Sequence, residues 1–228
     1  PTEPDFVAAG DSVRSAEGEP VVGDRQNIPN VTDIDCDSVP DLFLGRADGT
    51  VARWELDGFD SDGAPVFRLV DERFEEIEIV AQIGGQPAGP APSPFLPTLR
   101  HGANGMGLAD WDGDGDVDVL WGDFFEPSVL LIENTGSCER PDMRGEPRPV
   151  RTVPEDSLLT SGYNVPVPVD WDADGDLDLV VGVLGGAFNP NRTASSNLQL
   201  WERTDGGALR RVTDRLLDGI DAGSESLP

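Results

Sequence analysis

Three stretches of the chain place aspartates at alternating positions, a spacing that lets several carboxylates converge on one hard cation. They cover residues 33–45, 110–122 and 170–182 and share the pattern D-x-D-x-D-[G/S]-x-x-D, then three residues, then Gly. With the first aspartate as position 1, the carboxylates stand at positions 1, 3, 5 and 9. The candidate metal-binding residues are Asp33, Asp35, Asp37, Val39 and Asp41 in the first stretch, Asp110, Asp112, Asp114, Asp116 and Asp118 in the second, and Asp170, Asp172, Asp174, Asp176 and Asp178 in the third.

An oxygen-rich set of this kind favours Ca²⁺, which takes ~6–8 oxygen ligands. Mg²⁺ keeps more water, and Zn²⁺ prefers His or Cys, whereas the chain has a single His. By analogy with the EF-hand loop, we expect side-chain ligands at positions 1, 3, 5 and 9 and the backbone carbonyl at position 7. A solvated acidic turn is the alternative, and the repetition of the pattern argues against it.

The three loops should bind calcium with different strength. Gly115 and Gly175 hold position 6, where a positive φ lets the backbone curl around the ion. The first loop has Ser38 at that position and Pro40 at position 8, so its turn is harder to form. The sequence therefore predicts two strong calcium sites and a weaker one in the first loop.

Short apolar segments follow each acidic loop in the same order, with an insertion before them in the third unit. Residues 51–55, 129–133 and 198–202 correspond to one another, and so do residues 66–70, 149–153 and 209–213. These segments are rich in Val, Leu and Trp and lie between Gly, Asp and Pro, which is typical of strands. Each unit then reads strand, acidic loop, strand, loop, strand, turn, strand, a pattern typical of β-propeller blades. The predicted fold is all-β, with blades of four antiparallel strands.

The spacing of the loops defines the organisation of the chain. Successive loops begin 77 and 60 residues apart, which gives repeat units at approximately 27–80, 105–155 and 164–215 within a single propeller domain or segment, 1–228. Two long insertion loops, 81–104 and 184–197, are predicted between or within the units. The flanks resemble partial units. Because about three blades cannot close a ring, we expect part of a larger propeller; the alternative is a compact ring whose termini combine into a fourth blade.

The repeats resemble the FG-GAP/VCBS repeats of integrin-alpha-type β-propellers. The motif residues 110–122 and 170–182 carry the resemblance, with 33–45 a looser copy, and it extends over roughly 27–213. In that family the acidic loop joins the first two strands of a blade and binds Ca²⁺, which implies the same role for the aspartates here. The resemblance says little about function, because the family includes adhesion receptors, secreted bacterial proteins and domains attached to enzymes.

Composition restricts the partners. The chain has 16 basic and 44 acidic residues, a net charge of −28, which disfavours nucleic acid and anionic lipid surfaces. No apolar run is long enough for a membrane span. Cys36 and Cys138 either form one disulfide or remain two free thiols. Calcium sites of moderate affinity would fill outside the cytoplasm, so we expect a periplasmic, cell-surface or secreted protein.

The sequence supports three functions in decreasing order of preference. The first is a non-catalytic, calcium-stabilised propeller for protein–protein interaction or adhesion, or an accessory or scaffold subunit of a surface or membrane complex, with its partner bound by the two insertion loops. The second is a carbohydrate-active hydrolase or lyase, or its propeller domain, with His101 near the site. The third is an acidic spacer between other domains.

Overall fold

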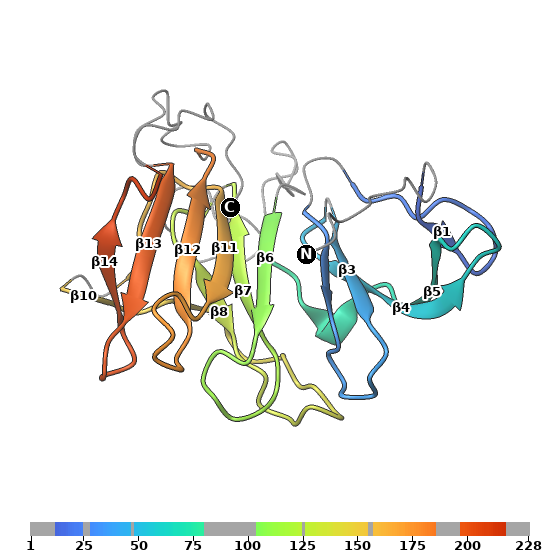
Figure 1. Cartoon of the computed structure of the whole chain (residues 1–228), viewed down its shortest axis with the longest axis horizontal. Coiled ribbons are helices and arrows are strands. Elements are labelled where there is room, and N and C mark those ends of the chain that lie inside the picture. The colour runs from blue at the N-terminus through green and yellow to red at the C-terminus, as the bar shows by residue number, and fades with distance from the viewer. Residues whose placement is uncertain are drawn as a thin grey trace, which may run out of the picture.

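The computed structural model describes residues 12–24, 28–46, 48–79, 104–124, 126–154, 157–185 and 197–217 (Figure 1). These residues form short strands and a single-turn 3-10 helix. The elements are β1 (Arg14–Ser15), β2 (Asn30–Thr32), β3 (Asp41–Gly45), β4 (Val51–Phe59), β5 (Pro65–Asp71), η1 (Phe74–Glu76), β6 (Asn104–Ala109), β7 (Asp118–Asp123), β8 (Leu130–Ile132), β9 (Arg148–Pro149), β10 (Thr152–Val153), β11 (Asn164–Val169), β12 (Asp178–Val183), β13 (Leu198–Arg203) and β14 (Leu209–Thr213). The predicted all-β class is confirmed.

The strands form three sheets, each built on four consecutive antiparallel strands. The first sheet contains β2 to β5, the second β6 to β9 and the third β11 to β14. The four consecutive strands of each sheet come largely from one predicted repeat unit. The acidic loop of that unit joins the first two of these strands. The repeated sequence pattern therefore produces a repeated hairpin order.

Two sheets gain a fifth strand that the sequence did not predict. β1 pairs with β5 and β10 pairs with β14, both in parallel orientation, so the segment before a unit adds an outer strand to that unit's sheet. Residues 149–153 were expected to form one strand and instead divide between two sheets. Val150 turns into the core, 4% exposed, and the Arg151 carbonyl accepts the N–H of Leu209 in the third sheet.

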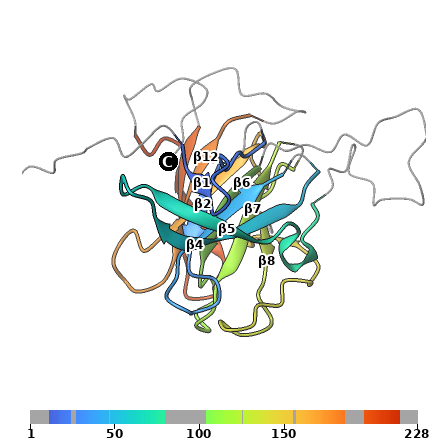
Figure 2. The same cartoon turned by 90° about the vertical axis from the view of Figure 1, so that its right-hand side faces the viewer.

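The sheets stack face to face, with the second between the other two (Figure 1), and Figure 2 views this stack from the first sheet. On the second strand of a sheet, successive side chains point to opposite faces of that sheet because the backbone is pleated. Val119 joins Phe43 in the core between the first and second sheets. Leu120 joins Leu179 in the core between the second and third sheets. Each interface is thus closed by apolar residues from both sides.

The glycine that ends the acidic motif lets neighbouring sheets approach. A Cβ on Gly45 would collide with the side chain of Asn104, and one on Gly122 would collide with the carbonyl of Asn164. Both asparagines begin the first strand of the next sheet. In the first two motifs this glycine is therefore a packing requirement between sheets.

Several sequence expectations concern residues outside the described ranges. They include most of the insertion loops 81–104 and 184–197, His101, and most of the flanking segments. Among the described residues, the sheets do not close into a ring. No helix found there is long and apolar enough to cross a membrane.

Candidate metal centre

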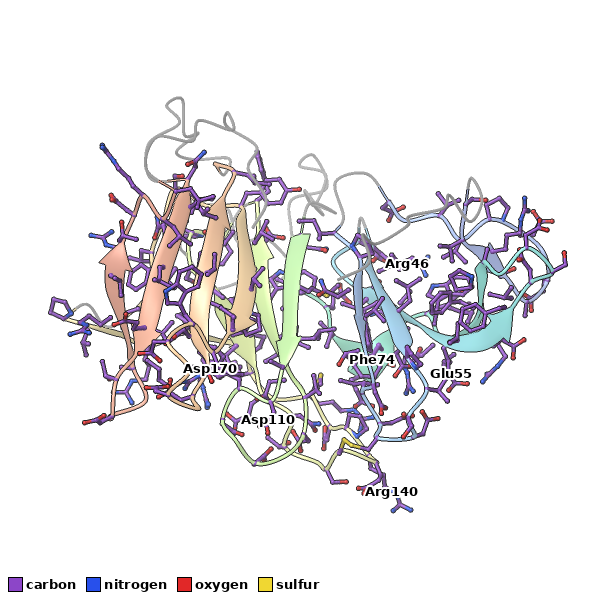
Figure 3. All side chains as sticks on the ribbon, viewed as in Figure 1. Arg46, Glu55, Phe74, Asp110, Arg140 and Asp170 are labelled. Carbon is purple, nitrogen blue, oxygen red and sulfur yellow. A yellow bond between two sulfur atoms is a disulfide. The ribbon has the colours of Figure 1, made fainter. Side chains whose placement is uncertain are left out.

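The three acidic loops lie at one edge of the stacked sheets. The first loop (33–40) joins β2 to β3, the second (110–117) joins β6 to β7, and the third (170–177) joins β11 to β12. Figure 3 shows Asp110 and Asp170 along this edge. The repeated hairpin therefore presents every loop in the same direction.

The backbone of each loop turns through two left-handed residues. At position 6, φ is 68° for Ser38, 99° for Gly115 and 97° for Gly175. Position 4 is also left-handed and is occupied by Cys36, Gly113 and Ala173. The first loop adopts this curl with two non-glycine residues, which carries a conformational cost. The sequence pattern predicted the left-handed residue at position 6 but not the one at position 4.

Each loop gathers the carboxylates of positions 1, 3 and 5 into an acidic triplet. Within a triplet, one oxygen from each residue lies within 4.8 Å of the others. The position 1 aspartate also organises the loop, because Asp110 accepts the N–H groups of Gly113 and Gly115 at 2.8 and 3.0 Å. The triplets are Asp33, Asp35 and Asp37; Asp110, Asp112 and Asp114; and Asp170, Asp172 and Asp174.

The position 9 aspartate lies outside these triplets and holds the two ends of the loop together through hydrogen bonds from backbone N–H groups. Asp41, Asp118 and Asp178 are 0%, 1% and 2% exposed. One oxygen of each accepts the N–H of the position 2 residue, at 3.0 to 3.1 Å. In the second and third loops the other oxygen accepts the N–H of Asn134 or Arg203, both at 2.8 Å.

Position 7 carries an additional carboxylate in two loops. Asp116 and Asp176 occupy it, whereas the first loop has Val39. Asp116 is 5% exposed, and one oxygen of Asp116 and of Asp176 is buried without a hydrogen-bond partner among the described residues. A buried carboxylate oxygen without a partner is energetically unfavourable, so both loops contain an unsatisfied acceptor beside an acidic triplet.

Burial and mutual repulsion oppose full ionisation of the carboxyl groups in the second loop. Burial, followed by repulsion from Asp114 and Asp112, raises the pKa of Asp116 to about 6. Burial also raises the pKa of Asp118 to about 6, although its two backbone hydrogen bonds act in the opposite direction. In the third loop, burial and then repulsion from Asp174 raise the pKa of Asp176. A bound cation would relieve this repulsion.

The first loop differs because an arginine enters it. Arg53 of β4 donates from its terminal nitrogen to Asp35 at 2.6 Å and from Nε to Asp41 at 2.8 Å. Arg53 is 8% exposed, so the guanidinium is enclosed with the two carboxylates. Burial raises the pKa of Asp41, and the hydrogen bond from Arg53 opposes that effect. Sequence reasoning missed this residue; the signal was an arginine where the other repeats have Leu131 and Leu200.

A disulfide and an arginine side chain connect neighbouring loops. Cys36 of the first loop forms a disulfide with Cys138 in the loop after β8, which resolves the question of their pairing (Figure 3). Arg203 connects the second and third loops, donating to the carbonyls of Trp111 at 3.0 Å and Leu177 at 2.9 Å. Its guanidinium also stacks 4.0 Å from the centre of the Trp111 ring. The acidic edge is therefore cross-linked between sheets.

Comparison with models of known families, with curated proteins and with solved structures found no significant match. The resemblance to FG-GAP/VCBS repeats therefore rests on the motif residues themselves. What the chain shows directly is an all-β stack of antiparallel sheets with acidic clusters suited to a metal ion.

Proposed function

We propose that the chain is a non-catalytic, calcium-binding β-propeller module, with each sheet as one blade of a larger propeller. The repeated strand order and face-to-face stacking support the blade assignment. The position 2 residues Ile34 and Trp111 are buried against the following sheet, 0% and 7% exposed. Their counterpart on the third sheet, Trp171, is 51% exposed, which supports a further blade packing there.

The unsatisfied buried oxygens of Asp116 and Asp176 carry the calcium assignment. They stand at matching positions in two loops, beside acidic triplets that already contain three carboxylates each. Asp110, Asp112, Asp114 and Asp116 would hold the ion in the second loop, and the corresponding aspartates would hold it in the third. Calcium would add positive charge among these carboxylates, and their hard oxygen atoms match its ligand preference.

The module would act outside the cytoplasm by binding another protein. The Cys36–Cys138 disulfide supports an oxidising compartment, periplasmic, cell-surface or secreted. A net charge of −28 favours a partner with a basic surface, such as a subunit of a surface or membrane-associated complex. Adhesion and an accessory or scaffold role in such a complex are both consistent with this surface.

Calcium titration of the metal-free protein tests the metal assignment. Sites with Kd of ~10⁻⁴–10⁻³ M would add about 0.6–2 kcal/mol each to the free energy of unfolding in about 2 mM calcium. Thermal unfolding followed by circular dichroism would show a higher Tm with calcium than with equal magnesium. An unchanged Tm would contradict the assignment.

Isolation of the native protein from its source tests the interaction role. The purification would run in parallel with calcium and with a chelator, and mass spectrometry would identify proteins that co-purify. A stoichiometric partner lost on chelation is the expected result. A protein that elutes alone under both conditions would count against an interaction module.

A further inference from the structure

The three repeats place different residues beside the acidic loop on the third strand of each sheet. Arg53 pairs across the sheet with Phe43, two residues beyond the position 9 aspartate. Leu131 pairs with Leu120, and Leu200 with Val180, at the same register. Leu131 and Leu200 are 6% and 3% exposed and belong to the apolar interior. Only the first of these three equivalent positions brings a positive charge to its loop.

The guanidinium of Arg53 neutralises the carboxylates that a cation would use. It lies 2.6 Å from Asp35 at position 3, 2.8 Å from Asp41 at position 9, and 3.9 Å from Glu55. In the other loops the corresponding oxygen of the position 9 aspartate accepts a neutral backbone N–H. A calcium ion on Asp35 would therefore meet a fixed, buried positive charge sharing the same carboxylate.

The first loop also offers fewer oxygens. Val39 stands where the other loops supply the unsatisfied carboxylates of Asp116 and Asp176. One oxygen of Asp35 is buried without a hydrogen-bond partner in the described part of the chain, but the guanidinium already binds its other oxygen. The first loop thus combines a lower negative charge with a built-in cationic group.

We propose that the first acidic loop binds no calcium, and that Arg53 replaces the ion as its internal counter-charge. This inference rests on the proposed calcium binding by the second and third loops, and makes the chain a two-site protein. The Cys36–Cys138 disulfide adds a covalent link at the same loop, so the first loop keeps its position without metal. Arg53 is then the residue that prevents the first loop from responding to calcium.

Equilibrium dialysis with radioactive calcium counts the bound ions. The full chain with its disulfide intact would be dialysed against calcium up to about 5 mM, above the affinity range of extracellular modules. About 0.15 M NaCl would screen nonspecific attraction to the acidic surface. The variants are Arg53→Leu, which copies the other repeats, and Arg73→Leu, which removes an exposed arginine paired with Glu78 and controls for net charge.

The expected counts are two ions for the wild type and for Arg73→Leu, and three for Arg53→Leu. Removing a position 5 carboxylate by Asp114→Asn or Asp174→Asn should lower the wild-type count to one. Three ions on the wild type, or two on a folded Arg53→Leu variant, would overturn the inference. If Arg53→Leu does not fold, the wild-type count still decides between two sites and three. A count of zero throughout would instead reject the proposed calcium binding itself.

Discussion

The buried carboxyls of the second loop should give the metal-free protein an unusual dependence on pH. Burial raises the pKa of Asp116 and of Asp118 to about 6, from the ordinary value of 3.8. A carboxyl with a raised pKa binds its proton more tightly in the folded chain than in the unfolded chain. Its stabilising contribution is therefore complete below about pH 4 and is lost as the pH rises through about 6.

The expected effect is large. The difference between 3.8 and about 6 corresponds to about 3 kcal/mol for one such carboxyl, and the two contributions add to less than twice this because Asp116 and Asp118 repel one another. Asp48 behaves in the opposite way, because the hydroxyl of Thr50 lowers its pKa, so its contribution is lost only as the pH falls below 3.8. Between pH 4.5 and 7 the metal-free protein should therefore lose stability as the pH rises. Calcium binds the deprotonated carboxylates and should abolish or reverse that loss.

Urea unfolding followed by tryptophan fluorescence measures this dependence. The metal should be removed beforehand by dialysis, because a chelator protonates and loses affinity over the same pH range. Asp116→Asn is the matched variant: it cannot ionise, and its slope should be clearly shallower than that of the wild type, because the other carboxyls with raised pKa values remain. A metal-free protein that gains stability between pH 4.5 and 6.5, or an unchanged slope in Asp116→Asn, would refute the reasoning.

Three further predictions concern the groups that close and connect the loops. At about pH 4.5, where folded Asp118 is protonated, Asp118→Ala leaves two backbone N–H groups without their acceptor, so urea unfolding should show a loss of about 3 kcal/mol. Arg203→Met removes two hydrogen bonds to backbone carbonyls, with donor–acceptor distances of 2.9 and 3.0 Å, and should lower the free energy of unfolding by about 2 kcal/mol in the same assay. The control is Arg210→Met, which removes an exposed ion pair and should lower it by less than about 1 kcal/mol. The double variant Cys36→Ala with Cys138→Ala opens a link across 102 residues and should lower the free energy of unfolding by about 4 kcal/mol; an unchanged midpoint would mean that this link adds no stability.

The local features of this protein were largely readable from its sequence. Short segments rich in Val, Leu and Trp, bounded by turn residues, predicted the second and third strands of each unit, because strand formation depends on a short stretch of chain. The alternating aspartates predicted the acidic triplets for a similar reason. A loop of this length with left-handed turns brings positions 1, 3 and 5 together by its own backbone geometry.

The tertiary structure decided which distant residues complete those local features. Whether Arg53 reaches Asp35 depends on the register between β3 and β4 and on burial behind the loop. The pairing of Cys36 with Cys138 and the transfer of β10 to the third sheet depend in the same way on how the sheets stack. The position 9 aspartate shows the division most directly: its spacing belongs to the motif, but burial and backbone amides make it the group that closes the loop. A short motif determines which ligands are near one another, whereas long-range packing determines the charge and solvent exposure that each ligand experiences.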